Sequence, residues 1–294
     1  MKIATAAYPL DMLASWADYA AKLSDWVADA ARQGAELAVF PEYVAMELAT
    51  LAGPEAAGDL ERSLHAVSER IADADDLHGD LAAKHGLHIL AGSAPVLDPD
   101  LGPRPVNRAR LFTPTGARGN QDKQIMTRFE RDTWHVAAGG PLRLFDTALG
   151  KIGILICYDS EFPLLGRALA EADLILVPSC TEALTGYSRV RIGAMARALE
   201  TQCVSVMSSI VGTADWSPAV DICTGMGGIF GPPDTGFPAT GVIAEGVMNR
   251  PGWTVAEIDP ARIAQVRADG VVLNRRHWTD QNGRDTSVTP VALR

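Results

Sequence analysis

The sequence is poor in cysteine, and its few cysteines form neither a disulfide framework nor a zinc-binding pattern. The 294 residues include four cysteines, at positions 157, 180, 203 and 223. No two of them have the CxxC spacing of a zinc site, and the six histidines are scattered along the chain. The pattern excludes a small disulfide-stabilised fold and argues against a zinc site.

Clusters of basic residues and long apolar runs are also missing. The net charge is −10, and no Lys/Arg cluster suggests a nucleic-acid-binding face. No stretch approaches the roughly 20 apolar residues of a membrane helix. The N-terminus, MKIATAAYPLDM, lacks the basic segment and apolar run of a signal peptide. We therefore predict a cytoplasmic protein with no nucleic-acid partner and no membrane contact.

Short β-like runs alternate with helical patterns along the chain, in which 47% of the residues are hydrophobic. Residues 11–33 and 59–85 repeat apolar side chains every three or four positions, which is typical of amphipathic helices. Gly34 and Gly86 follow them, where a helix end favours a residue that tolerates positive φ. The alternation predicts an α/β or α+β domain.

The middle and the end of the chain depart from this alternation. LHILAGSAPV, VNRARLFTP and NQDKQIM are three β-like segments separated by Pro/Gly turns. Residues 162–171 and 187–202 have helical patterns again. We predict one domain over residues 1–270 and a polar tail over 271–294, which either packs on a partner subunit or frays.

Three predicted strand ends carry side chains of reactive types. Glu42 follows the buried segment LAVF and a proline, Lys123 lies within NQDKQIM, and Cys157 ends the apolar segment KIGILIC. Each has an ordinary alternative role: a solvated loop carboxylate, a lysine on the solvent face of a strand, or a small buried apolar side chain.

Together the three residue types fit one chemistry, nucleophilic acyl transfer. A thiol becomes a good nucleophile when a base removes its proton. Histidine is the usual base, and His135 leaves a Cys–His pair open. A buried glutamate with a raised pKa can replace it. A lysine ammonium would stabilise both a thiolate and a developing oxyanion.

The segments FPEY, DKQIMTRFE and CYDSEFP, in this order, resemble the three signature blocks of the nitrilase (carbon–nitrogen hydrolase) superfamily. RALETQ resembles a further block of the family. The resemblance implies a four-layer α-β-β-α sandwich. It also implies subunits that pair helix face to helix face into homodimers or higher homo-oligomers, with no metal or organic cofactor.

The resemblance also implies a role for each reactive residue. Cys157 would attack the carbonyl carbon of the substrate, and Glu42 would accept the thiol proton. Lys123 and the backbone N–H of Tyr158 would stabilise the oxyanion, and water would hydrolyse the thioester. Glu130, seven residues after Lys123, would orient the substrate or Lys123. Its alternative is a surface glutamate in the charged run RFERD.

Further candidates lie in and after the loop that follows the segment DLILVPS, which the resemblance places at the substrate pocket. Cys180, Thr181 and Tyr187 are expected to touch the substrate, with ordinary loop packing as the alternative. Arg189 and Arg191 could bind a substrate carboxylate. They could equally pair with two acidic residues of this region, Glu182 and Glu200.

These observations predict a hydrolase that cleaves a non-peptide C–N bond in a small linear amide or N-carbamoyl compound. A nitrilase is one alternative, although the resemblance associates a tyrosine at position 158 with amidases. An acyltransferase is another, although the lipid-modifying members carry membrane helices. The last alternative is a non-catalytic small-molecule binding protein. The presence of Glu42, Lys123 and Cys157 argues against this alternative.

Overall fold

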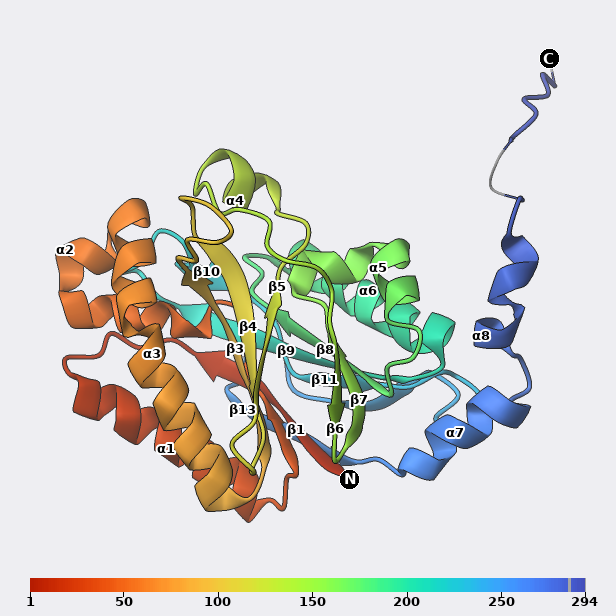
Figure 1. Ribbon diagram of the computed structural model, residues 1–294, viewed down its shortest axis with the longest axis horizontal. Coiled ribbons are helices and arrows are strands. Elements are labelled where there is room, and N and C mark those ends of the chain that lie inside the picture. The colour runs from red at the N-terminus through yellow and green to blue at the C-terminus, as the bar shows by residue number, and fades with distance from the viewer. Residues whose placement is uncertain (285–286, 294) are drawn as a thin grey trace.

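The structure is a computed structural model that describes residues 1–284 and 287–293, with a mixed β-sheet at its centre (Figure 1). The described strands are β1 (Lys2–Pro9), β2 (Leu37–Val39), β3 (His88–Val96), β4 (Val106–Phe112), β5 (Arg118–Asp122), β6 (Leu144–Thr147), β7 (Gly150–Ile154), β8 (Leu174–Ser179), β9 (Val204–Thr213), β10 (Ile222–Cys223), β11 (Gly228–Phe230), β12 (Val242–Glu245) and β13 (Gly252–Glu257). Their main path runs β5-β4-β3-β2-β1-β9-β8-β7-β6. Parallel pairing of β1 with β9 joins the two halves.

Helices cover both outer sides of these strands (Figure 1). The α-helices are α1 (Trp16–Arg32), α2 (Pro54–Ala57), α3 (Leu60–His85), α4 (Arg128–Asp132), α5 (Pro163–Ala168), α6 (Leu184–Thr201), α7 (Pro260–Asp269) and α8 (Asn274–His277). The 3₁₀ turns are η1 (Val44–Ala52), η2 (Cys157–Glu161) and η3 (Trp278–Gln281). Figure 1 shows α1, α2 and α3 on one side of the strands and α5 and α6 on the other.

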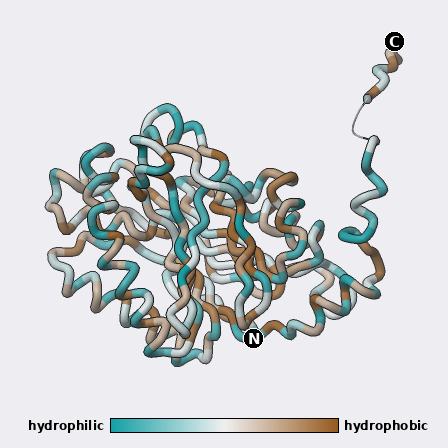
Figure 2. The backbone as a smooth tube through the Cα atoms, in the orientation of Figure 1, coloured by the Kyte–Doolittle hydropathy of each residue, from teal (hydrophilic) through white to brown (hydrophobic). Residues whose placement is uncertain are grey.

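Side chains alternate between two cores along the strands. In β1, Ala4 and Ala6 join the core beneath α1 and α3, whereas Ile3 joins the core that also contains residues of β7, β8, β9 and α6. In β3, Ile89 and Leu90 divide in the same way. Apolar side chains on both faces of a strand mean that both faces are covered. The predicted four-layer α-β-β-α sandwich is confirmed, and Figure 2 shows hydrophobic residues concentrated in its central strands.

The helix boundaries follow the capping residues. Ser15 precedes α1, and its hydroxyl accepts a hydrogen bond from the backbone N–H of Asp18. Asp59 caps α3 in the same way. Gly34 and Gly86 have φ of 78° and 66°, so the predicted glycine stops are confirmed after both helices.

Two strands end earlier than the sequence pattern predicts. Strand β5 ends at Asp122, so Lys123 lies after the strand and not within it. It turns inward there because buried carboxylates surround its ammonium group. Strand β7 ends at Ile154. Near that point Asp159 accepts the backbone N–H of Ile156, which removes that group from the ladder.

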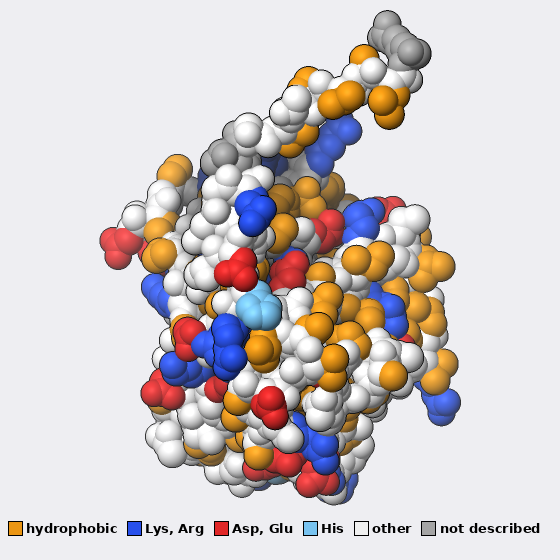
Figure 3. Space-filling view, turned by 90° about the vertical axis from the view of Figure 1, so that its right-hand side faces the viewer, with side chains coloured by type: hydrophobic (Ala, Val, Ile, Leu, Met, Phe, Trp, Pro, Cys, Tyr) orange, Lys and Arg blue, Asp and Glu red, His pale blue; other side chains and the backbone are white. Residues whose placement is uncertain are grey.

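The predicted tail, residues 271–294, begins by packing on its own chain. The carboxylate of Asp234 accepts the backbone N–H groups of Val271 and Val272, and Arg275 pairs with Glu171. Further on, three side chains are strongly exposed on the segment that projects in Figure 3: Val288, Val291 and Leu293. Residues 285, 286 and 294 of the tail lie outside the described residues. Packing of the tail on a partner subunit stays a prediction.

The sequence predicts no membrane-spanning helix, and the lengths and compositions of the helices bear on this prediction. Within the described residues, no helix combines the length and the apolar composition needed to cross a membrane.

Candidate active site

The structure brings the predicted reactive residues together in one cavity of roughly 620 Å³. Its lining includes Glu42, Lys123, Glu130 and Cys157, together with Tyr158, Cys180 and Thr181. Glu42, Lys123 and Glu130 are each no more than 2% exposed. Charged groups are buried this completely only when ion pairs and hydrogen bonds within the protein replace their lost hydration.

A close approach of two backbones holds Glu42 in place. A Cβ atom at Gly92 would lie 2.0 Å from the carbonyl oxygen of Pro41, and Gly92 has a φ of 63°. Only glycine fits such a contact without strain. Next to it, the Ser93 hydroxyl accepts the backbone N–H of Tyr43 at 3.0 Å. Strand β3 therefore fixes the backbone on both sides of Glu42.

Lys123 lies between two carboxylates. Its Nζ atom donates to Glu42 Oε1 at 2.7 Å and to Glu130 Oε2 at 2.6 Å. Burial alone would lower the pKa of Lys123, but the charges of Glu130 and Glu42 outweigh it and hold that pKa well above its ordinary value. Lys123 is therefore a permanent cation in this site.

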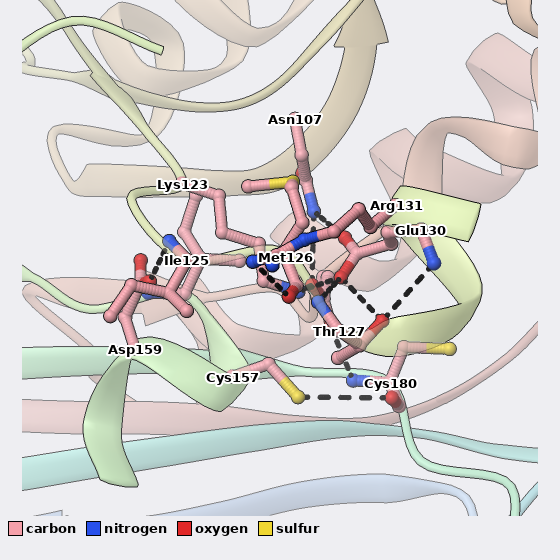
Figure 4. Close-up of polar contacts among 12 residues, drawn as sticks. Asn107, Lys123, Ile125, Met126, Thr127, Glu130, Arg131, Cys157, Asp159 and Cys180 are labelled. Carbon is pink, nitrogen blue, oxygen red and sulfur yellow. Dashed lines mark hydrogen bonds and ion pairs between the residues drawn. The ribbon is translucent and has the colours of Figure 1, made fainter. Parts of the chain in front are cut away.

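Glu130 both caps helix α4 and accepts hydrogen bonds within the cavity (Figure 4). It is the third residue of α4 and forms a capping box with Thr127, whose N–H and hydroxyl both donate to Glu130 Oε2. Its Oε1 atom accepts from the Tyr43 hydroxyl at 2.7 Å. Burial raises the pKa of Glu130, but Lys123 and these hydrogen bonds outweigh it and the net shift is downward. Glu130 therefore stays ionised.

Glu42 differs from Glu130 in the direction of its pKa shift. Burial, opposed by Lys123, raises the pKa of Glu42 above its ordinary value, and the negative charge of Glu130 adds to the rise. One lysine cannot fully compensate two carboxylates in a buried site. Two neighbouring carboxyl groups with opposite shifts are a common acid–base arrangement, in which the group with the raised pKa exchanges the proton. That group is Glu42.

Cys157 has a constrained backbone and a neutral thiol. Its φ is 50°, which is uncommon for a residue other than glycine and concentrates at functional sites. Its Sγ atom donates to the carbonyl oxygen of Cys180 at 3.8 Å. Burial, followed by the charge of Glu42, raises the pKa of Cys157 well above its ordinary value. The thiol must therefore lose its proton to a neighbour as it reacts.

Asp159 connects the turn at Cys157 to the loop after Lys123. Its carboxylate accepts the backbone N–H groups of Gln124 and Ile125 from that loop and of Ile156 from the turn. Burial raises the pKa of Asp159 to about 7 despite these donors. Asp159 therefore stabilises the turn through three backbone hydrogen bonds.

Helix α6 supports the turn at Cys157 from outside. Arg197 donates from Nη1 to the carbonyl oxygen of Ser160 at 2.8 Å. A Cβ atom at Gly193 would lie 2.7 Å from the same oxygen. The turn and the helix are thus in direct backbone contact.

This contact predicts that Gly193→Ala should be destabilising by about 1–3 kcal/mol, because the added methyl group cannot fit without moving the turn. A urea titration followed by fluorescence would measure the free energy of unfolding. The matched control is Gly79→Ala in α3, where the nearest atom lies at 3.6 Å. That change should stabilise by roughly 0.5–1 kcal/mol. Equal effects of the two substitutions would contradict the close contact.

Two residues of the site were not found from the sequence. Asn107 in β4 donates from Nδ2 to Glu42 Oε1 at 2.9 Å and to Glu130 Oε1 at 3.2 Å, so it bridges both carboxylates. Tyr43 reaches Glu130, as described above. An asparagine in the strand segment VNRARLF is only a weak signal of a functional residue. An aromatic residue after FPE is more typical of the hydrophobic core.

The predicted pocket residues divide into two groups. Tyr158, Cys180 and Thr181 line the cavity. Tyr187 does not appear in its lining, because it lies on the inner face of α6 and is 3% exposed. There it belongs to the core shared with β7, β8 and β9.

The two arginines also differ. Arg191 pairs with Glu245 at 2.5 Å, so the alternative in which it pairs with Glu182 or Glu200 is wrong. Glu200 pairs instead with Arg197, three residues earlier on α6. The Arg191 error arises because β12 brings Glu245 beside α6, which sequence distance does not reveal.

Arg189 keeps contact with the cavity. It lines the cavity, and its Nε atom lies 3.5 Å from Glu161 Oε1. Binding of a substrate carboxylate by Arg189 stays a prediction.

The donor groups of the site do not form a metal centre. Among the described residues, no group of three or more His, Cys, Asp or Glu side chains is arranged to hold a metal ion. The carboxylates of the site are instead compensated by the ammonium group of Lys123.

Comparison with known proteins gives the same family as the sequence motifs. A family model described as carbon–nitrogen hydrolase matches residues 2–268. The chain is 33% identical over 274 residues to the probable hydrolase YhcX of Bacillus subtilis, covering 92% of this chain and 52% of that protein. It is 27% identical over 266 residues to the deaminated glutathione amidase of Synechocystis sp., covering 84% and 88%. The chain spans about half the length of the first two curated relatives it matches.

Solved structures show the same fold. A carbon–nitrogen hydrolase from Helicobacter pylori superposes with a TM-score of 0.74 at 16% identity, covering 97% of this chain and 95% of that one. An amidase from Nesterenkonia sp., solved after Michael addition of acrylamide at its active-site cysteine, superposes with a TM-score of 0.66 at 23% identity. That match covers 95% and 99%.

Proposed function

Since the chain belongs to the carbon–nitrogen hydrolase family, we propose that it hydrolyses a non-peptide C–N bond in a small linear amide or N-carbamoyl compound through a thioester on Cys157. One observation carries the proposal. Glu42, a buried carboxylate with a raised pKa, contacts the Lys123 ammonium and the backbone N–H of Cys180, whose carbonyl accepts the Cys157 thiol. Relatives named as amidases support the amide class.

Acylation begins when Cys157 attacks the substrate carbonyl carbon. The thiol proton passes to Glu42, whose raised pKa suits it to accept that proton near neutral pH. The carbonyl oxygen becomes an oxyanion, which Lys123 and the backbone N–H of Tyr158 stabilise. When the tetrahedral intermediate collapses, Glu42 gives its proton to the leaving nitrogen. Ammonia or an amine departs and the acyl group remains on sulfur.

Deacylation repeats these steps with water as the nucleophile. Glu42 removes a proton from the water, which attacks the thioester carbonyl. The same oxyanion donors stabilise the second tetrahedral intermediate. Its collapse breaks the C–S bond, and the Cys157 sulfur recovers a proton from Glu42. Glu130 takes no proton in this cycle and instead keeps Lys123 charged and oriented.

We further propose that subunits pair through α5 and α6. Three large apolar side chains on these helices are exposed: Leu164 at 75%, Ile192 at 65% and Leu199 at 39%. Exposed apolar side chains on neighbouring helices favour burial against another protein surface. Homodimers or higher homo-oligomers follow from such a face.

The pH profile should show an acid limb that belongs to Glu42. Glu42 acts as a base only when ionised, so kcat/KM should fall as the pH decreases through its raised pKa, above the ordinary range of a glutamate. No loss should occur on the alkaline side through the ordinary lysine range, because the pKa of Lys123 is raised. Initial rates from pH 4 to 10, with fluorescence as a check of folding, would measure both limbs. An acid limb at or below the ordinary pKa of a glutamate would contradict the assignment.

The proposed function is tested by intact-protein mass spectrometry during turnover. Wild-type protein would be mixed with a panel of small amides, N-carbamoyl compounds and nitriles, and ammonia release would be followed in parallel. We expect an acyl adduct on the wild type and none on Cys157→Ala. Ammonia release that survives Cys157→Ala would exclude the thioester mechanism.

A further inference from the structure

Two other cysteines face each other in the wall of the cavity. The Sγ atoms of Cys180 and Cys223 lie 3.7 Å apart, and both residues line the cavity that contains Cys157. Both are free thiols. The catalytic steps proposed above use neither side chain.

The backbone holds these two cysteines on neighbouring extended segments. Thr224 donates its N–H to the carbonyl oxygen of Thr181 at 2.8 Å, and the Thr181 hydroxyl donates to the carbonyl oxygen of Thr224 at 2.8 Å. Cys223 lies in β10 and is paired with Gly212 of β9. A disulfide requires sulfur atoms about 2.05 Å apart. The two sulfur atoms, now 3.7 Å apart, must approach each other to form the bond.

Cys180 also holds the reactive groups through its own backbone. Its N–H donates to Glu42 Oε2 at 3.0 Å. Its carbonyl oxygen accepts the thiol of Cys157, as Figure 4 shows. A shift of Cys180 would therefore move the hydrogen-bond partners of both the base and the nucleophile.

We propose that Cys180 and Cys223 are a redox pair that a peroxide oxidises to a reversible disulfide, and that this disulfide lowers the hydrolase activity. The effect on activity rests on the proposed function, whereas the formation of the disulfide does not. Transient disulfides of this kind are the usual form of cytosolic redox sensing.

The reaction balances with hydrogen peroxide as the oxidant. The sulfur of one thiol displaces water from peroxide and becomes a sulfenic acid, and a second water molecule is released in the next step. There the other thiol attacks the sulfenic sulfur, the S–S bond forms and the S–O bond breaks. The departing oxygen leaves as water with the proton of the second thiol. A dithiol reductant returns both cysteines to thiols.

The local environment sets the rate of this oxidation. The hydrogen bond with Cys223, followed by burial, raises the pKa of Cys180 well above its ordinary value. Because thiolates react and thiols do not, oxidation should be slow at neutral pH and faster in alkaline buffer. This dependence of the oxidation rate on pH distinguishes the pair from a sensor cysteine with a low pKa, which reacts at neutral pH.

The bond itself is tested in a Cys157→Ala background, where the nucleophile cannot be oxidised. Protein treated with hydrogen peroxide would be digested without reduction and analysed by mass spectrometry. We expect one cross-linked peptide pair joining Cys180 and Cys223, which dithiothreitol releases. The cross-link should be absent from Cys180→Ser and from Cys223→Ser. It should persist in the matched control Cys203→Ser, whose buried cysteine is not among the residues that line the cavity.

The functional consequence is tested in protein with Cys157 intact. Peroxide should lower ammonia release by about 10- to 100-fold, because a displacement of about 1 Å in a positioning group costs up to this much. Dithiothreitol should restore the rate, and Cys223→Ser, compared with its own untreated rate, should show a smaller dithiothreitol-reversible loss than the wild type. Separate sulfinic products on the two cysteines without a cross-link would overturn the proposal. A cross-link without ammonia release on any substrate would instead count against the proposed function.

Discussion

Replacing Lys123 with methionine should cost the protein both activity and stability. Methionine keeps much of the side-chain length but removes the charge, so Glu42 and Glu130 would remain buried without their shared cation. Breaking a buried ion pair from one side typically costs about 3–5 kcal/mol. Loss of an oxyanion donor should also lower kcat by about 10²–10³-fold.

Urea unfolding and steady-state rates would measure the two effects of Lys123→Met. Without the lysine, the pKa values of the two carboxyl groups should rise in the folded state. A raised folded-state pKa favours folding at low pH and loses that contribution as pH rises, so the stability deficit should shrink on acidification. Lys151→Met, at an exposed position of β7, is the control and should change stability by less than about 0.5 kcal/mol. A folded Lys123→Met protein with a normal rate would refute the role of Lys123.

Replacing Glu42 with glutamine should remove activity without unfolding the protein. Glutamine has the same shape, and its carbonyl oxygen can still accept a hydrogen bond from Lys123 or from Cys180. It cannot take the thiol proton, and loss of a general base costs about 10²–10⁴-fold in rate. Stability should be unchanged or higher, because the raised pKa of Glu42 shows that its ionised form is disfavoured by burial.

The rate of Glu42→Gln should be measured across the pH range together with its thermal midpoint. The residual activity should lack the acid limb of the wild type. Glu69→Gln on the exposed face of α3 serves as the control for a neutralised glutamate and should behave as the wild type. An unchanged acid limb in Glu42→Gln would assign that limb to another group.

The sequence predicted the structure best where the local backbone geometry alone determines the secondary structure. The helices that end before Gly34 and Gly86 follow from local patterns. Glu42 and Cys157 were identified because polar residues after buried strands collect at one edge of a sheet. Lys123 was identified in the same way, but the local pattern placed it within a strand, whereas β5 ends one residue before it.

The missing parts of the site depend on distant contacts. Asn107 is 65 residues from Glu42 in sequence, and Arg191 is 54 residues from Glu245. No local pattern encodes such distances, because the strand order of the sheet sets them. Tyr187 was assigned to the pocket from its loop, whereas the rotation of α6 turns its ring into the core.

The two hydrogen bonds from Thr127 to Glu130 Oε2 have a consequence for protein engineering. The same oxygen atom accepts from the N–H and hydroxyl of Thr127 and from the Lys123 ammonium. Substitutions that strengthen or weaken the hydrogen bonds at the start of α4 therefore also alter the electrostatic environment of Lys123. A library selected for heat resistance in this segment would be selecting at the same time on catalytic rate, so the two properties cannot be optimised independently there.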